Sequence, residues 1–167
     1  MVTGDVHDFD SLHGAWKTQQ HRLKHRGVGS QEWYDFAATV CQAPFLDGMA
    51  NVGELSAPTQ GISGLTLRTF DPKERLWSIY WVNSRDGLLQ PPVLGGFAGN
   101  RGEFYGVDDD NGRPIVARYV WSKLDADHAR WEQAFSYDGQ KTWEVNWTAD
   151  FERADAAICE GGRPRRP

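Results

Sequence analysis

Short runs in which hydrophobic and polar residues alternate follow one another along most of this chain. The clearest pair lies in ARWEQAFSYDGQKTWEVNWTADF, residues 129–151, where two aromatic-rich runs flank Asp138-Gly139. Alternation places every second side chain on the same face of a strand, and Asp-Gly is a favoured hairpin turn. The segment therefore predicts a β-hairpin with a bulky apolar face.

The same pattern predicts about ten strands separated by turns rich in Asp, Asn and Gly. Their expected ranges are 15–25, 31–42, 49–56, 64–70, 76–83, 92–98, 102–107, 114–122, 129–136 and 142–151. No stretch repeats apolar residues with the 3.6-residue period of a long helix. Residues 5–14 are expected to form a short helical turn, capped by Asp8 or Asp10, that closes one end of a barrel. The predicted fold is all-β: an antiparallel up-and-down β-barrel with a short N-terminal helical plug.

The length of 167 residues fits one domain, and the bulk composition narrows the function classes. We assign residues 1–152 to the barrel and residues 153–167, rich in Gly, Arg and Pro, to a flexible C-terminal tail. The net charge of -5 argues against a nucleic-acid partner. Neither an apolar signal segment nor a membrane span is visible, so we expect a soluble, cytoplasmic protein without a membrane partner.

The chain has two cysteines, Cys41 in an apolar strand pattern and Cys159 in the polar tail. The two could form a disulfide, but we favour the more usual case, in which Cys41 is a small buried hydrophobic residue. No Cys-x-x-Cys motif or Cys/His cluster is present, so no metal site is expected.

The more apolar face of each strand is expected to line the barrel interior. The inward sets on this basis are Trp16, Thr18, Gln20 and Arg22; Leu65, Leu67 and Thr69; Trp77, Ile79, Trp81 and Asn83; Ile115, Ala117, Tyr119 and Trp121; Trp131, Gln133 and Phe135; and Trp143, Val145 and Trp147. Turn lengths pair Thr69 with Trp77, Phe135 with Trp143, and Tyr105 with Ile115. The last pairing turns Glu103 and Tyr105 inward, although a β-bulge would reverse any of these assignments.

Such an interior is mostly aromatic with a few polar groups, which is typical of a ligand pocket. The candidate walls are Trp81, Trp121, Trp131 and Trp147, and the candidate polar anchors are Asn83, Gln133, Tyr105, Tyr119 and Arg22. The alternative is a packed core in which the aromatic residues only place their polar tips against a partner.

Three residues are candidates for acid–base catalysis: Glu103, Tyr105 and Tyr119. Burial among tryptophans would raise the pKa of Glu103 and let it act as a general base. If its strand has the opposite phase, Glu103 is instead a solvated edge residue. Arg118 faces outward on the chosen phase, and the reversed phase would make Arg118 an internal cation and turn Asn146 inward. We keep Arg118 and Asn146 as second-choice ligand residues.

Three segments carry a resemblance to a known group: Gly14-Ala15-Trp16 after the N-terminal turn, FDPKERLWSIYW, and ARWEQAFSYDGQKTWEVNW. Over about residues 8–152 they resemble the calycin superfamily, which includes lipocalins, fatty-acid-binding proteins and nitrobindin-like barrels, and most closely bacterial lipocalin-like barrel proteins of unassigned function. The resemblance implies a lipocalin-like barrel whose base is closed by Trp16. Nitrobindin-like barrels bind haem through a histidine, but none of the five histidines here matches that motif, so no cofactor is expected.

These features predict a barrel that binds a small, largely apolar molecule of aromatic or polyketide-like character. It would act as a cofactor-independent cyclase, isomerase or lyase of secondary metabolism. The alternatives are a non-catalytic binding or carrier protein, or a filled barrel that acts through protein contacts, as in a homodimer. A buried carboxylate or tyrosine that titrates near neutral pH would favour the enzyme, and a pocket without such a group would favour the carrier.

Overall fold

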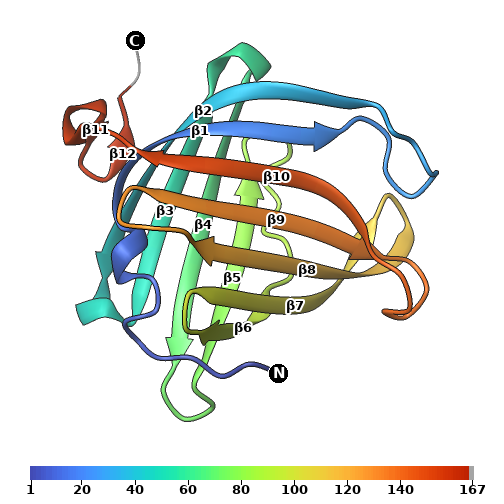
Figure 1. Ribbon diagram of the computed structural model, residues 1–167, viewed down its shortest axis with the longest axis horizontal. Coiled ribbons are helices and arrows are strands. Elements are labelled where there is room, and N and C mark those ends of the chain that lie inside the picture. Colours follow the sequence, from blue (N-terminus) through green and yellow to red (C-terminus); the bar gives the residue numbers. More distant parts are fainter. Residues whose placement is uncertain (166–167) are drawn as a thin grey trace.

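The computed structural model describes residues 1–165 and forms a closed barrel of ten antiparallel strands (Figure 1). The strands are β1 (Gly14–Leu23), β2 (Trp33–Phe45), β3 (Ala50–Ala57), β4 (Ile62–Asp71), β5 (Leu76–Asn83), β6 (Val93–Ala98), β7 (Arg101–Asp110), β8 (Arg113–Lys123), β9 (His128–Ser136) and β10 (Glu144–Arg153). Each strand pairs with its neighbours in sequence, and β1 pairs with β10 to close the ring. The prediction of ten strands in an antiparallel barrel is confirmed.

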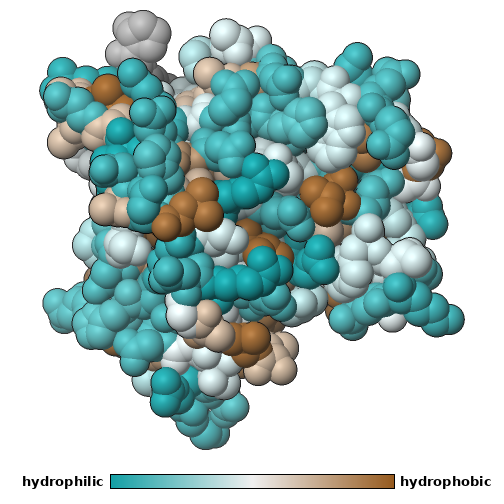
Figure 2. Space-filling model, viewed as in Figure 1, coloured by the Kyte–Doolittle hydropathy of each residue, from teal (hydrophilic) through white to brown (hydrophobic). Residues whose placement is uncertain are grey.

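Helical structure is limited to single turns of 3-10 helix within the described residues. They are η1 (Asp10–Leu12), η2 (Leu46–Gly48), η3 (Pro58–Gln60) and η4 (Ala156–Ile158). None of these turns has the length or the apolar character that a membrane-spanning helix needs. Figure 2 shows one face of the molecule covered mainly by hydrophilic residues, with apolar residues scattered between them.

Predicted inward faces are correct for four strands. Thr18 and Gln20 of β1 are buried, as are Trp77 and Ile79 of β5. The interior faces of β8 and β9 likewise hold the buried side chains that were predicted for them: Ile115, Ala117, Trp121, Gln133 and Phe135. Alternation was sufficient here because the tryptophans of these strands, Trp16, Trp77, Trp81, Trp121 and Trp131, all share the inward face.

The predicted face of β4 is wrong. Phe70, rather than Thr69, pairs with Trp77, because the turn between β4 and β5 has four residues, 72–75, with Arg75 in the left-handed region at φ 57°. This shift by one residue exchanges the two faces of the strand. Leu65, Leu67 and Thr69 therefore lie on the outer face.

The predicted face of β7 is wrong for a similar reason. The strands continue to a two-residue turn at Asn111-Gly112, where both residues have positive φ angles of 54° and 86°. This turn pairs Tyr105 with Arg118 instead of Ile115. Asp, Asn and Gly tolerate the left-handed backbone of such tight hairpins. Glu103 and Tyr105 consequently lie outside the barrel.

A β-bulge corrects the predicted start of β10. Phe135 pairs with Glu144 instead of Trp143, and the register shifts between Val145 and Trp147. The extra residue turns Trp147 inward, while Trp143 and Val145 lie on the outer face. The Trp143 ring there packs edge-to-face against Tyr105, with 5.9 Å between centroids.

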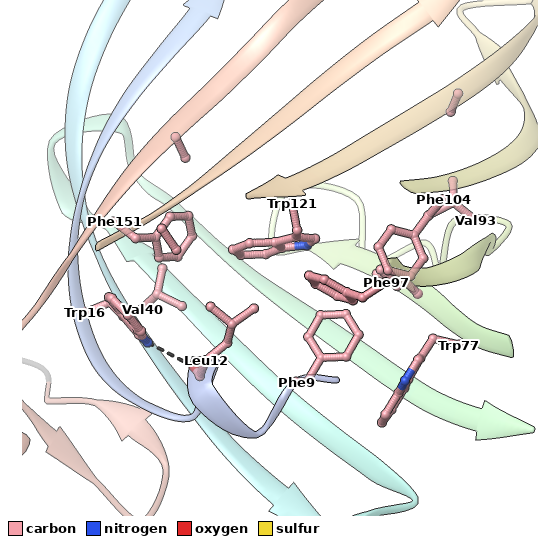
Figure 3. Packing of buried hydrophobic residues seen from close by; sticks show 14 of the residues in the cluster. Phe9, Leu12, Trp16, Val40, Trp77, Val93, Phe97, Phe104, Trp121 and Phe151 are labelled. Carbon is pink, nitrogen blue, oxygen red and sulfur yellow. Dashed lines mark hydrogen bonds between the residues drawn. The ribbon is translucent and has the colours of Figure 1, made fainter. Parts of the chain in front are cut away.

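The N-terminal segment crosses the barrel end from which β1 begins, and its apolar side chains enter the interior (Figure 3). Phe9 and Leu12 are buried in the main core cluster. The indole of Trp16 donates a hydrogen bond of 2.9 Å to the Leu12 carbonyl, and that of Trp77 donates one of 2.9 Å to the Asp5 carbonyl. We refer to this end as the closed end.

The predicted helical plug is reduced to the three residues of η1. No side chain caps it, so the predicted capping role of Asp8 or Asp10 is wrong. Asp8 instead accepts a hydrogen bond from the Asp5 backbone amide at 2.8 Å, and Asp10 pairs with the imidazole of His7 at 2.9 Å. The two carboxylates stabilise the turn that precedes η1 rather than the first turn of a longer helix.

The segment predicted to be a flexible tail contains regular structure. After η4, strands β11 (Cys159–Glu160) and β12 (Arg163–Pro164) form a small two-stranded sheet, and residues 166–167 of the predicted tail lie outside the described residues. Arg163 forms an ion pair with Glu54 of β3 at 2.7 Å. The C-terminal segment thereby packs on the outer face of the barrel beside β2 and β3.

A disulfide joins Cys41 to Cys159, with their Cα atoms 6.0 Å apart. The interpretation of Cys41 as an unbridged residue is wrong. Cys41 lies on the outer face of β2, and it is only 1 % exposed because the C-terminal segment covers it. Disulfides are uncommon in cytosolic proteins, so the bridge does not favour the predicted cytoplasmic location.

Candidate functional site

A cavity lies inside the barrel between the closed end and the opposite rim. The space that the centres of water molecules can occupy is about 80 Å³. All unfilled space, including the open mouth of the cavity, amounts to about 670 Å³. Eight strands line it: β1 to β5 and β8 to β10. The lining residues are Gln20, Val40, Gln42, Gly53, Leu55, Thr66, Arg68, Ile79, Trp81, Tyr119, Trp121, Trp131, Gln133, Trp147, Ala149 and Phe151.

Four tryptophans form most of the apolar wall. Trp147 packs edge-to-face against Trp81 at 6.1 Å and against Trp131 at 5.5 Å between ring centroids. Tyr119 packs in the same manner on Trp131 at 5.1 Å. Edge-to-face contacts of this kind fix ring orientations, so the aromatic wall is rigid before any ligand arrives.

Arg68 of β4 is the one cation among the lining residues, and it is only 4 % exposed. Its Nη1 donates hydrogen bonds of 2.8 Å to the side-chain oxygens of Gln42 and Asn51. Its guanidinium also lies over the rings of Phe9, at 4.8 Å, and Trp121, at 5.7 Å. Burial lowers the pKa of Arg68 to about 9, which leaves it charged at neutral pH.

No carboxylate balances this charge within residues 1–165, because both hydrogen-bond partners of Arg68 are neutral amides. Its Nε atom is fully buried and has no hydrogen-bond partner among the described residues. The nearby His13 is half-buried, and desolvation together with the Arg68 charge lowers the pKa of its imidazole. His13 is therefore neutral at pH 7 and adds no second positive charge beside Arg68.

Two glutamines are held firmly in place by hydrogen bonds around the cavity. Gln42 donates to the Leu12 carbonyl at 2.9 Å while it accepts from Arg68. Gln20 donates to Thr18 at 2.7 Å and accepts from the indole of Trp147 at 2.8 Å. These bonds fix the amide orientations, and they connect the cavity floor to the closed end through Leu12.

Tyr119 and Gln133 supply polar groups on the opposite wall. Burial raises the pKa of the Tyr119 hydroxyl above its ordinary value of 10.0, so the hydroxyl stays protonated at neutral pH. Gln133 donates a hydrogen bond of 2.8 Å to Asn146, whose own amide nitrogen is buried without a partner among the described residues. The protonated Tyr119 hydroxyl can therefore donate a hydrogen bond to a ligand, but it cannot act as a base at neutral pH.

The cavity brings together six of the predicted site residues: Trp81, Trp121, Trp131, Trp147, Tyr119 and Gln133. Asn146 does not line the cavity itself, but the β-bulge places its side chain against Gln133 behind the wall. Asn146 was expected to turn inward only if the strand phase that places Arg118 outward were reversed. That phase is not reversed, and the β-bulge turns Asn146 inward instead.

Glu103 and Tyr105, two of the predicted catalytic residues, do not reach the cavity. On the outer face, Glu103 accepts hydrogen bonds of 2.9 Å from Arg101 and from the Tyr105 hydroxyl. The bond from Arg101 lowers the pKa of Glu103, contrary to the predicted rise. This correction follows from the two-residue turn between β7 and β8, which reverses the phase of β7.

Two predicted ligand residues also lie elsewhere. Arg118 is on the outer face, where it forms an ion pair with Glu132 at 3.4 Å and covers the Trp143 ring. Asn83 ends β5, and its side chain bonds the following turn at Arg85 and Asp86. Neither contributes to the cavity lining.

Arg22 is on the inward face of β1, as predicted, but it sits beyond the cavity lining. Its guanidinium covers the far side of Trp147 at 4.4 Å from the ring centroid. Desolvation lowers the pKa of Arg22, and the nearby charges of Arg26 and Arg85 act in the same direction. Arg22 therefore places a cation against the Trp147 ring, outside the cavity lining.

Sequence reasoning missed Arg68, Gln42 and Thr66. All three missed residues are polar, and Thr66 and Arg68 are on β4, whose phase was reversed. One signal was available: a four-residue turn pairs Phe70 with Trp77, two aromatic residues, and that pairing turns Arg68 inward. The face of β4 that carries Thr66 and Arg68 is the more polar one. It was therefore assigned to the outside, because the more apolar face of each strand was taken as the interior.

Within the described part of the chain, no group of three or more His, Cys, Asp or Glu side chains is arranged to hold a metal ion. No protein-family model matches this chain, and no curated protein matches it significantly. The candidate site therefore rests on its own geometry.

Proposed function

We propose that this protein is a calycin-like barrel that binds a small, largely apolar molecule, with aromatic or polyketide-like character, inside its cavity. The observation that carries the proposal is the tryptophan-walled cavity with a few fixed polar groups. Ligand pockets typically combine apolar walls with a small number of oriented polar anchors. A barrel with a filled core would leave no such space.

The size of the cavity supports this proposal. A site needs roughly 10–15 Å³ of space for probe centres to hold one water molecule. The cavity offers about 80 Å³ by the same measure. It therefore has room for several waters or for one small organic molecule, and its aromatic walls favour the organic molecule.

Binding without catalysis is the function that the lining residues favour. Arg68 and Tyr119 are the two ionisable side chains among them. Neither titrates near neutral pH, because Arg68 remains a cation and burial raises the pKa of Tyr119. Efficient general acid–base catalysis requires a group with a pKa near the working pH. We therefore place a binding or carrier protein ahead of an enzyme.

A cofactor-independent cyclase or isomerase is the second candidate, and the position of Tyr119 supports it. A protonated hydroxyl opposite a cation can stabilise negative charge that develops on a substrate oxygen. A rigid aromatic wall can also hold a flexible chain in a folded, reactive pose. This function would require the substrate to react without a protein base.

Ligand titration with a size-matched pair of variants tests the binding proposal. Ala149 lines the cavity, whereas Ala37 is exposed on the outer face of β2. The probes are indole, cinnamamide, phenylacetamide, octanamide and the corresponding cinnamate, phenylacetate and octanoate, each titrated by calorimetry. We expect saturable binding of at least one probe by the wild type, and we expect Ala149→Leu to weaken it about tenfold or more by filling the cavity.

The Ala37→Leu control should bind the same probe with wild-type affinity. Circular dichroism and thermal unfolding would establish that both variants are folded. The proposal is wrong if no probe binds the wild type, or if Ala149→Leu and Ala37→Leu bind equally well.

A further inference from the structure

The buried guanidinium of Arg68 has an unbalanced charge and unused donors. A guanidinium carries five N–H donors, and both hydrogen bonds that Arg68 makes to described residues come from Nη1. Nε is buried without a partner, and Nη2 makes no hydrogen bond with residues 1–165. Buried charges in proteins are ordinarily paired with an opposite charge, because an isolated ion loses its hydration without compensation.

The surroundings of Arg68 do not explain its charge as a purely structural feature. Its neighbours are two neutral amides and the rings of Phe9 and Trp121. Methionine or leucine would fill a similar volume without a desolvation cost. By contrast, Arg118, on the outer face, has a carboxylate partner in Glu132. The chain thus pairs an arginine that is 22 % exposed and leaves the buried one, at the cavity wall, without a counter-ion.

We propose that the cavity ligand is a monoanion, with a carboxylate head group that binds Arg68 and an apolar body that lies against the tryptophan wall. This inference rests on the proposed function, and it names the chemical class of the ligand. Arginine binds carboxylates through short, charge-assisted hydrogen bonds that neutral groups do not match. The free Nη2 supplies the donor, and the lining residues contribute no negative charge that would repel the ligand.

The orientation of the ligand follows from the positions of these groups. Arg68 contacts Phe9 and Gln42, and Gln42 bonds Leu12, so the cation lies at the floor of the cavity next to the closed end. Trp81, Trp131 and Trp147 lie further along the barrel toward the rim that carries Arg22. The head group therefore enters first, and Tyr119 and Gln133 contact the body of the ligand from the opposite wall.

Matched acid and amide probes test this proposal, because each pair has nearly the same shape and differs in charge. The pairs are cinnamate and cinnamamide, phenylacetate and phenylacetamide, and octanoate and octanamide. We expect at least one acid to bind the wild type about tenfold or more tighter than its amide, as one charge-assisted contact predicts. Arg68→Met should bind the amide as before and lose the preference for the acid.

Arg118→Met serves as the matched control, since it removes an arginine outside the cavity and should keep the preference for the acid. Equal affinity for acid and amide in the wild type, or an acid preference that survives in Arg68→Met, would overturn the inference and leave the proposed function standing. Failure of every acid and every amide to bind would overturn both. The wild-type comparison remains decisive even if Arg68→Met does not fold.

An inorganic anion is the competing occupant of the Arg68 site. The unfolding temperature of the wild type in sodium chloride is compared with that in sodium fluoride at equal ionic strength. This comparison distinguishes an inorganic anion from a carboxylate ligand. We expect no specific stabilisation by chloride. Stabilisation by chloride that disappears in Arg68→Met, together with no acid preference, would assign the site to a small inorganic ion and overturn the proposal.

Discussion

The closed end and the cavity use similar side chains in opposite ways. At the closed end, Phe9 packs on Trp77 at 5.0 Å and on Phe97 at 5.3 Å between ring centroids, and the buried indoles of Trp16 and Trp77 reach backbone carbonyls. In the cavity, aromatic rings surround unfilled space. Two polar atoms nearby, Nε of Arg68 and Nδ2 of Asn146, have no partner among the described residues.

This difference shows that the cavity does not result from a shortage of large side chains. The same strands supply both regions: β5 contributes Trp77 to the closed end and Trp81 to the cavity. One end of the barrel is packed by itself, and there only Nε2 of His13 is buried without a hydrogen-bond partner among the described residues. We propose that a ligand completes the other end by filling the space and satisfying the polar groups.

The largest expected effect comes from emptying the closed end. Phe104 is fully buried against Phe97 and Phe9, so Phe104→Ala should lower the free energy of unfolding by about 3–5 kcal/mol. Val107 on the same strand is 74 % exposed, so Val107→Ala should change the free energy of unfolding by less than about 0.5 kcal/mol. Urea unfolding measures both. A loss under about 1 kcal/mol for Phe104→Ala would contradict the tight packing of this end.

The disulfide is expected to have the next largest effect. It joins residues separated by 118 positions, so Cys159→Ser should lower the free energy of unfolding by about 2–4 kcal/mol. A reducing agent should bring the wild type down to the stability of the variant and leave the variant unchanged. If the reductant has no effect on the wild type, Cys41 and Cys159 are not bridged.

Removal of Arg68 should affect stability far less than removal of Phe104. Arg68→Met leaves the buried side-chain oxygens of Gln42 and Asn51 without a donor, and the relieved desolvation of an unpaired cation offsets this loss. We expect the free energy of unfolding of the ligand-free protein to change by less than about 1 kcal/mol. A loss of about 3–5 kcal/mol, as for a broken buried ion pair, would show that Arg68 is a structural element of the barrel.

The smallest effect concerns the turn between β9 and β10, distant from the closed end. Hydrogen bonds from the Thr142 hydroxyl, at 2.6 Å, and the Thr142 amide, at 2.9 Å, hold the pKa of Asp138 at about 2, below its ordinary value of 3.8. A depressed carboxyl pKa stabilises the folded state above pH 3.8, and this contribution is lost as the pH falls toward 2.

The stability difference between the wild type and Asp138→Asn should therefore shrink over that pH range. The side-chain carbonyl resonance of Asp138, followed by NMR during an acid titration, gives the pKa directly. A midpoint at or above 3.8 would contradict the hydrogen-bonded turn.

Strand number and barrel closure could be predicted from the sequence because turns and alternation are local properties. The inward faces of β8 and β9 also followed, since Trp121 and Trp131 alternate with polar or small residues. Four of the six predicted site residues that line the cavity, Tyr119, Trp121, Trp131 and Gln133, lie on these two strands.

The strand faces that failed depend on turn geometry that alternation does not contain. Arg75 and Asn111 adopt positive φ angles, and the bulge beside Asn146 inserts one residue into β10. Each feature moves a register by a single position and reverses a face. Arg68 was missed as a direct consequence. The disulfide was missed because Cys41 meets Cys159 only after the C-terminal segment folds back across β2.

Tryptophan indole signals test the division of the barrel most directly. The chain has eight tryptophans, of which Trp81, Trp121, Trp131 and Trp147 line the cavity, while Trp16, Trp33, Trp77 and Trp143 do not. We would record the indole N–H resonances of ¹⁵N-labelled protein during titration with the tightest-binding acid, assigning each by Trp→Phe substitution. We predict that the four cavity resonances shift together and saturate at one equivalent while the other four stay in place. Shifts confined to Trp33 and Trp143 on the outer face, or no shifts at all, would contradict it.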